Sequence, residues 1–191
     1  MNKFAYLVAA SAFAVSAFGQ GQISLKNSAT VNPVNDASGK PLTGTSYLAQ
    51  VWYGASAGAL TGSFAPSPFR VSTTTQPGTW NPAAAGGPGN IGTFPAGTFG
   101  PGSTVTLQVA VWDSAVAGAS AASALAKAPG TGLSSTFTYT IPTDPLAIPG
   151  GMEGMKSFNL LPAGGGPVVP EPTTIALGAL GAAALLWRRR K

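Results

Sequence analysis

The chain contains no cysteine and no histidine, and only 8% of its residues are charged. Without cysteine there is no disulfide and no thiol nucleophile, so burial has to stabilise the fold. Without histidine there is no imidazole base, no Ser-His-Asp triad and no histidine-based zinc site. With 10 lysines and arginines and 5 aspartates and glutamates, little material remains for an active site made of ionisable groups.

Most of the net positive charge lies at the two ends of the chain. The formal net charge of +5 first suggests a nucleic-acid partner. However, Lys3 and the run from Arg188 to Lys191 supply half of the cations. Between the ends, the cations are nearly balanced by acids: Lys26, Lys40, Arg70, Lys127 and Lys156 stand against Asp36, Asp113, Asp144 and Glu153. We therefore expect a nearly neutral body that does not bind nucleic acid.

The acidic residues of the body do not suggest catalysis. A glycosidase-like pair of carboxylates would have to come from these four acids. Asp36 and Asp144 lie in turn sequences, where an aspartate commonly accepts hydrogen bonds from backbone amides. Asp113 ends an expected strand, and Glu153 lies among glycines. The turn from Asn32 to Gly39 offers oxygens to calcium, but with a single carboxylate its affinity should be poor. The sequence predicts neither an enzyme nor a cofactor.

Segments that alternate apolar and polar residues predict β-strands along the whole body. The expected strands are 22–27, 46–54, 69–71, 104–113, 135–141 and 155–161. In the clearest one, 104–113, the side chains of Val105, Leu107, Val109 and Val111 should face inward. The alanine-rich segment 114–127 predicts one short surface helix, weakened by Gly118.

Glycine and proline, 26 and 17 in number, separate these segments. Residues 76–102 are especially rich in both, and we expect a long irregular loop pinned by Trp80, Ile91, Phe94 and Phe99. Short strands with such turns predict an all-β fold, an antiparallel β-sandwich or a jelly-roll-like domain with Gly/Pro-rich loops, over residues 20–161. Residues 162–169 form a Gly/Pro linker.

One stretch of the chain is repeated. Val51 to Ala59 and Val111 to Ala119 both begin with Val-Trp and end with Ala-Gly-Ala. A single repeat does not indicate a solenoid. We interpret the repeat as two equivalent strands that each carry a tryptophan and then leave the sheet, which suggests a duplicated half of the fold.

The tryptophans are the candidate binding residues of the body. Trp52 and Trp112 lie opposite the inward-facing set of their strands, and Trp80 lies in a turn-rich loop. Flat aromatic faces can stack on sugar rings, and Trp80 is our candidate for sugar stacking. The alternative for all three is packing in the core or at the edge of the sheet.

The N-terminus has the pattern of a signal peptide. Lys3 precedes an apolar run from Phe4 to Phe18, and the small residues Ala17 and Gly19 occupy the positions that signal peptidase reads. We expect residues 1–19 to be removed after Gly19, with cleavage after Ala17 as one alternative and a retained anchor as another. Export would then use Sec-type machinery.

The C-terminus combines a rigid motif, an apolar segment and a basic end. Pro170 and Pro172 hold the backbone extended around Glu171, so a helix can begin only after Pro172. A helix from Thr173 to Trp187 would be about 22 Å long, short for a bilayer core of about 30 Å. Snorkelling arginines and local thinning would accommodate it. We expect one transmembrane helix that Trp187 anchors at the interface, with cytoplasmic Arg188, Arg189, Arg190 and Lys191. The alternative is a buried helix with a solvated basic tail.

This end, residues 170–191, resembles the PEP-CTERM sorting signal of exported proteins from Gram-negative bacteria. The resemblance implies recognition by an exosortase, a membrane enzyme thought to cut near Pro170-Glu171-Pro172, after transient residence in the inner membrane. It also implies a place in the cell envelope or in an extracellular or biofilm matrix. On this basis we expect an exported structural protein, with a carbohydrate-binding adhesin that contacts exopolysaccharide as the alternative.

Overall fold

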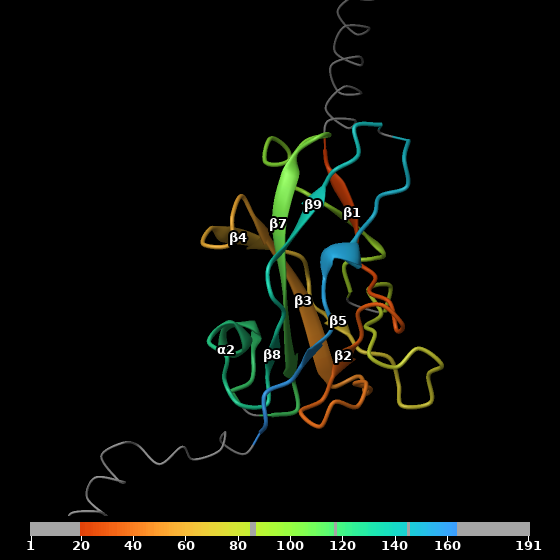
Figure 1. Ribbon diagram of the computed structural model, residues 1–191, viewed down its shortest axis with the longest axis vertical. Coiled ribbons are helices and arrows are strands. Elements are labelled where there is room, and N and C mark those ends of the chain that lie inside the picture. Colours follow the sequence, from red (N-terminus) through yellow and green to blue (C-terminus); the bar gives the residue numbers. More distant parts are fainter. Residues whose placement is uncertain (1–19, 85–86, 117, 145, 164–191) are drawn as a thin grey trace, which may run out of the picture.

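Two long neighbouring strands organise the computed structural model, which describes residues 20–84, 87–116, 118–144 and 146–163. They are β3 (Tyr47–Gly54) and β7 (Thr104–Asp113). The two strands pair antiparallel along the whole length of β3, from Tyr47 opposite Asp113 to Gly54 opposite Thr106. Figure 1 shows them at the centre of the body, with shorter strands on both sides.

The shorter strands of this sheet repeat one arrangement. The chain after β3 returns as β4 (Leu60–Ser63), which pairs with the C-terminal part of β3, and then as β5 (Ser67–Pro68), which pairs with its N-terminal part. The chain after β7 does the same with β8 (Gly132–Leu133) and β9 (Phe137–Thr140). The repeated Val-Trp stretches therefore occupy equivalent places in adjacent antiparallel strands, which supports the duplication hypothesis.

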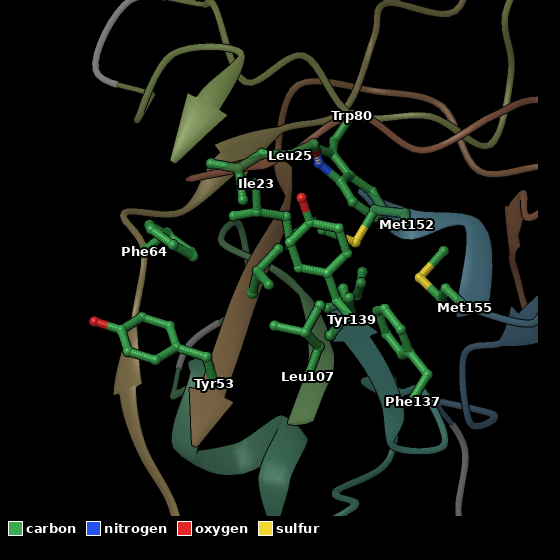
Figure 2. Close-up of a cluster of buried hydrophobic side chains, with 14 of the residues drawn as sticks. Ile23, Leu25, Tyr53, Phe64, Trp80, Leu107, Phe137, Tyr139, Met152 and Met155 are labelled. Carbon is green, nitrogen blue, oxygen red and sulfur yellow. Dashed lines mark hydrogen bonds between the residues drawn. The ribbon is translucent and has the colours of Figure 1, made fainter. Parts of the chain in front are cut away.

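A second layer faces one side of this sheet. It contains β1 (Gln22–Ser24) paired antiparallel with β6 (Ile91–Thr93), and β2 (Val34–Asn35) paired parallel with β10 (Phe158–Asn159). The short 3₁₀ helix η1 (Met152–Gly154) adds Met152 to the same core. Figure 2 shows side chains of both layers in contact, and the Tyr139 hydroxyl donates a hydrogen bond to the Gln22 carbonyl at 3.0 Å. The described body is thus mostly strands with little helix.

The inward face of β7 is the one that the sequence predicts. Val105, Leu107, Val109 and Val111 are all 0% exposed. Ala110 and Trp112, on the other face of the same strand, are buried as well. The helix α2 (Ala121–Leu125) lies against β7, so both faces of its C-terminal part are covered.

The helix is much shorter than the predicted 114–127. Gly118 adopts a positive φ of 80°, which a right-handed helix does not allow. The helix begins only after Ser120, whose side chain caps the Ser123 amide while the Ser123 hydroxyl accepts from the Ser120 amide.

Several strand predictions need correction. The strand predicted at 22–27 is shorter than expected: β1 ends at Ser24, and one further hydrogen bond in the same register joins the Leu25 amide to the Asn90 carbonyl. The strand predicted at 69–71 does not form: β5 ends at Pro68, Phe69 makes an isolated bridge with Trp80, and the Arg70 amide donates to the Thr79 carbonyl. The closing strand predicted at 155–161 is shortened to β10, which pairs parallel with β2. Long-range pairing, and not local sequence, decides where so short a strand docks. The sequence reasoning missed β2, β4, β6 and β8.

The long loop at 76–102 is pinned largely as predicted. Trp80 and Phe94 are buried, and Phe99 packs partly buried against the core. Phe94 and Phe99 lie in a T-shaped contact with ring centroids 5.5 Å apart. Ile91 is the exception, because it points outward from β6 and is 40% exposed.

Candidate functional site

A polar cavity of about 540 Å³ opens between the loop at residues 26–30 and the segment at residues 70–76. This volume is in the range of small-molecule sites, about 300–1,000 Å³. Its polar lining consists of Lys26, Asn27, Ser28, Thr30, Arg70, Thr75 and Gln76, and Trp80 also borders it. The lining of the cavity is therefore mostly polar.

Asn27 and Asn32 hold the first wall of the cavity in place. The Asn27 amide nitrogen donates to the carbonyls of Asn32, at 3.1 Å, and Gly78, at 2.9 Å, and its side-chain oxygen accepts from the Trp80 amide at 3.2 Å. Asn32 is 2% exposed; its side chain accepts from the Ser28 amide and donates to a carbonyl of η1. The loop at 26–32 is thus tied to the core on both sides.

Arg70 forms the second wall and is anchored through one of its nitrogens. Its backbone carbonyl accepts from the Gly44 amide at 2.8 Å, and its Nε donates to the Thr79 hydroxyl at 3.1 Å. That hydroxyl donates in turn to the Gln76 carbonyl at 2.8 Å. Within the described part of the chain, the two terminal nitrogens of the guanidinium make no hydrogen bond, so they remain available to a ligand.

Among the residues that the structure describes, the lining of the cavity includes positive charges and no acidic side chain. Lys26 is exposed and Arg70 is half-buried. Neither forms an ion pair with a carboxylate among the residues that the structure describes. Two of the few cations of a nearly neutral body thus line the same cavity, without a counter-charge among the described residues.

The carboxylates of the body are instead occupied by neighbouring backbone amides. Each accepts a local backbone hydrogen bond: Asp36 from Ser38 and Lys40, Asp113 from Ala115, Asp144 from Leu146, and Glu153 from Gly151. The hydrogen bond from the Ser38 hydroxyl contributes most to holding the pKa of Asp36 below its ordinary value. The turn role expected for Asp36 and Asp144 is confirmed. Across the described ranges no three acidic side chains come together as metal ligands would.

Two buried tyrosines have pKa values raised above the ordinary value. Burial raises the pKa of Tyr53 above its ordinary value, and burial together with the nearby Glu153 carboxylate does the same for Tyr139. Both phenols are therefore protonated at neutral pH.

Trp80, the candidate for sugar stacking, is a packing residue. Its side chain is 1% exposed, and its Nε1 donates to the Leu25 carbonyl at 2.7 Å (Figure 2). Its ring makes a T-shaped contact with Phe69, with centroids 6.0 Å apart. No open ring face remains for a sugar, so the packing alternative describes its position. Trp80 borders the cavity but fixes its wall instead of touching a ligand.

The other two tryptophans differ from each other. Trp112 is 7% exposed, on the part of β7 that α2 covers. Trp52 is half-buried on the same face of the sheet, and its Nε1 is buried without a hydrogen-bond partner in the described part of the molecule.

Sequence reasoning missed the cavity, because Lys26 and Arg70 are far apart in the chain. Arg70 follows a strand and Lys26 precedes a turn, and residues 78–80 form hydrogen bonds with both segments. The signal that could have found them is negative: neither cation has an acidic residue near it in the sequence.

The predicted processing sites lie outside the described residues. This applies to Ala17 and Gly19, to Pro170, Glu171 and Pro172, and to Trp187, Arg188, Arg189, Arg190 and Lys191. Among the residues that are described, no helix has the length and apolar character needed to cross a membrane.

The comparison with known protein families concerns this C-terminal end. A family described as the PEP-CTERM protein-sorting motif matches residues 168–191. The chain carries a PEP-CTERM sorting motif. The motif implies export, a membrane-anchored C-terminal sorting signal and an exosortase-like membrane enzyme that acts on it. No curated protein and no solved structure matches the chain, and the central domain is not recognised as a family.

Proposed function

We propose that this PEP-CTERM protein is a structural component of the cell envelope or extracellular matrix, and not an enzyme. The observation that carries the proposal is the sorting motif at residues 168–191. The body supports it, because its carboxylates are held by local backbone amides and its buried tyrosines are protonated. The four carboxylates of the described body thus have structural roles.

The proposed route to the matrix begins at the N-terminus. Residues 1–19 direct Sec-type export, and signal peptidase cuts after Gly19. The segment from Thr173 to Trp187 then holds the protein transiently in the inner membrane, with its basic end in the cytoplasm. An exosortase-like enzyme recognises Pro170, Glu171 and Pro172, cuts the chain near this motif and releases or transfers the body.

The body that is delivered is an antiparallel β-sandwich in this proposal. The two layers of strands around one core and the repeated arrangement about β3 and β7 support that interpretation. The parallel pair β2–β10 is a local exception at one edge.

Removal of the Glu171 carboxylate tests the sorting step. In cells with an active exosortase, we expect wild-type protein to lose Arg188 to Lys191 and Glu171→Ala to keep them. Glu153→Ala is the matched control, because it makes the same chemical change in the exposed part of the body. Intact-mass measurement of the purified protein identifies both ends.

Two outcomes would contradict this proposal. One is a wild-type protein that keeps its basic end in such cells, and the other is Glu171→Ala processed like wild type. The structural role is tested separately by fractionation, which should place the mature body in the matrix; recovery as a free protein in the medium would refute that role. The alternative, a carbohydrate-binding adhesin, is favoured by the polar cavity and no longer by Trp80.

A further inference from the structure

We infer that the cavity between residues 26–30 and 70–76 binds acidic sugars of a polysaccharide, with Lys26 and Arg70 as the groups that bind the sugar carboxylate. This inference gives the adhesin alternative a defined site and ligand class. The site belongs to the described body, so it does not depend on the sorting step.

The charge of the cavity selects an anion. Lys26 and Arg70 both line it, no acidic side chain does, and neither cation has a carboxylate partner in the described residues. In a body whose charges nearly cancel, two cations without counter-charges in one hollow produce a local positive potential. The terminal nitrogens of Arg70 form a planar fork whose geometry matches a carboxylate.

The arginine is held in position before a ligand arrives. Its Nε is fixed by Thr79 at 3.1 Å, and its backbone is fixed by the Gly44 amide at 2.8 Å and the Thr79 carbonyl at 3.1 Å. An ordered side chain loses less conformational entropy on binding than a free one. A carboxylate that binds the terminal nitrogens therefore meets a prepared site.

The remaining lining suits hydroxyl groups. Ser28, Thr30, Thr75 and Gln76 bring hydroxyls and an amide, which both donate and accept hydrogen bonds. Trp80 is the one aromatic residue of the lining in the described part of the chain, and it is buried, so that part offers nucleic-acid bases no ring to stack on. A ligand with a carboxylate and many hydroxyls matches both features, and this is the chemistry of a uronic acid.

A second hollow indicates a chain instead of a single sugar. Arg70 also lines a neighbouring cavity of about 300 Å³ whose surface is mostly apolar. Its other lining residues are Pro68, Phe69, Val71 and Ala84, with Thr45, Thr73, Thr74 and Asn81 as the polar ones. Arg70 thus lines both cavities, and a neighbouring sugar unit of the same chain can place the apolar face of its ring in the second one. An oligomer should therefore bind more tightly than the monomer.

The experiment compares an acidic oligosaccharide with its uncharged form. The probe is oligogalacturonate, and the comparison ligand is the same oligomer with its carboxylates methyl-esterified. Binding is measured by isothermal titration calorimetry on the full-length chain in mild detergent. We expect the acidic oligomer to bind, its affinity to fall with added salt, and the esterified oligomer and the galacturonate monomer to bind more weakly by at least tenfold.

Variants assign the binding to the two cations. Arg70→Gln should lower the affinity roughly 10- to 100-fold, the loss expected for charge-assisted hydrogen bonds, and Lys26→Gln should lower it roughly 3- to 10-fold. Lys156→Gln is the matched control, because it removes an exposed cation that lies outside the cavity, and it should leave binding unchanged. Circular dichroism checks that each variant is folded. Because Lys26 is exposed, Lys26→Gln tests the cavity without disturbing the core.

Some results would overturn the inference. These are no binding of the acidic oligomer, equal binding of the acidic and esterified oligomers, or an effect of Lys156→Gln as large as that of Arg70→Gln. Full competition by inorganic phosphate would reveal a general anion site and would also overturn it. The Glu171→Ala protein should bind as wild type does, so a failure of sorting and a failure of binding can be told apart.

Discussion

The two tryptophans Trp80 and Trp52 allow one chemical change to be tested in opposite environments. The Nε1 of Trp80 donates to the Leu25 carbonyl at 2.7 Å, whereas the Nε1 of Trp52 is buried without a partner in the described residues. Replacement by phenylalanine removes the N–H group in both cases and keeps an aromatic ring. If buried hydrogen bonds decide stability here, Trp80→Phe should lower the free energy of unfolding, whereas Trp52→Phe should leave it unchanged or raise it.

The expected magnitudes follow from the partner left behind. In Trp80→Phe the buried Leu25 carbonyl loses its donor, which costs about 1–3 kcal/mol, and the smaller ring leaves space in a tightly packed core. The sum is a loss of about 2–4 kcal/mol. In Trp52→Phe a buried donor without a partner disappears, and the regained free energy offsets the lost packing of a half-buried ring. We expect a change between zero and about 1 kcal/mol of stabilisation.

Urea unfolding followed by far-UV circular dichroism measures both variants without relying on tryptophan fluorescence. Each kcal/mol should also move the melting temperature by roughly 3 °C in a domain of this size. The reasoning would be refuted if the two variants lost the same stability, or if Trp52→Phe lost more than Trp80→Phe. Either result would mean that ring volume, and not the hydrogen bond, governs the cost.

Two further predictions concern the β3–β4 hairpin and the turn at Asp36. A Cβ added at Gly54 would lie 1.8 Å from the Ala59 carbonyl oxygen, so Gly54→Ala should lower the free energy of unfolding by more than about 2 kcal/mol. A Cβ added at Gly58 meets nothing within 4 Å, so Gly58→Ala should be neutral or slightly stabilising. Urea unfolding measures both variants, and the opposite ranking would contradict this prediction. The hydrogen bond from the Ser38 hydroxyl is the main reason that the folded-state pKa of Asp36 lies below its ordinary value of 3.8. The contribution of Asp36 to stability is therefore fully present above pH 3.8, and it is lost as the pH falls through the folded-state pKa. In unfolding measured from pH 6 to pH 2, Asp36→Ala should therefore lose less stability on acidification than wild type, and identical pH profiles would disprove the link.

Local patterns located the long strands well. The alternation from Thr104 to Asp113 predicts β7 with its bounds and its buried face, because each apolar side chain lies on the same side of a pleated strand. The same reasoning comes within one residue of β3 at Tyr47. Both strands are long enough for the periodicity to be read without ambiguity.

The short strands could not be found in this way. β2 and β10 have two residues each, which is too few for any period, and they exist only because Val34 and Phe158 meet across the fold. The buried position of Trp80 is equally non-local, since the Leu25 carbonyl that accepts its hydrogen bond comes from a distant part of the chain. A loop tryptophan with polar neighbours therefore had the appearance of a binding residue.

The sequence by itself determined the class of the fold, the near neutrality of the body and the sorting motif at residues 168–191, because these depend on composition and on the order of neighbouring residues. Only the tertiary structure decided which side chains meet. It buried Trp80 and brought Lys26 and Arg70 to one cavity, through hydrogen bonds between segments that are distant in the chain. Such contacts depend on how loops dock on the core, and no local pattern of residues encodes that docking.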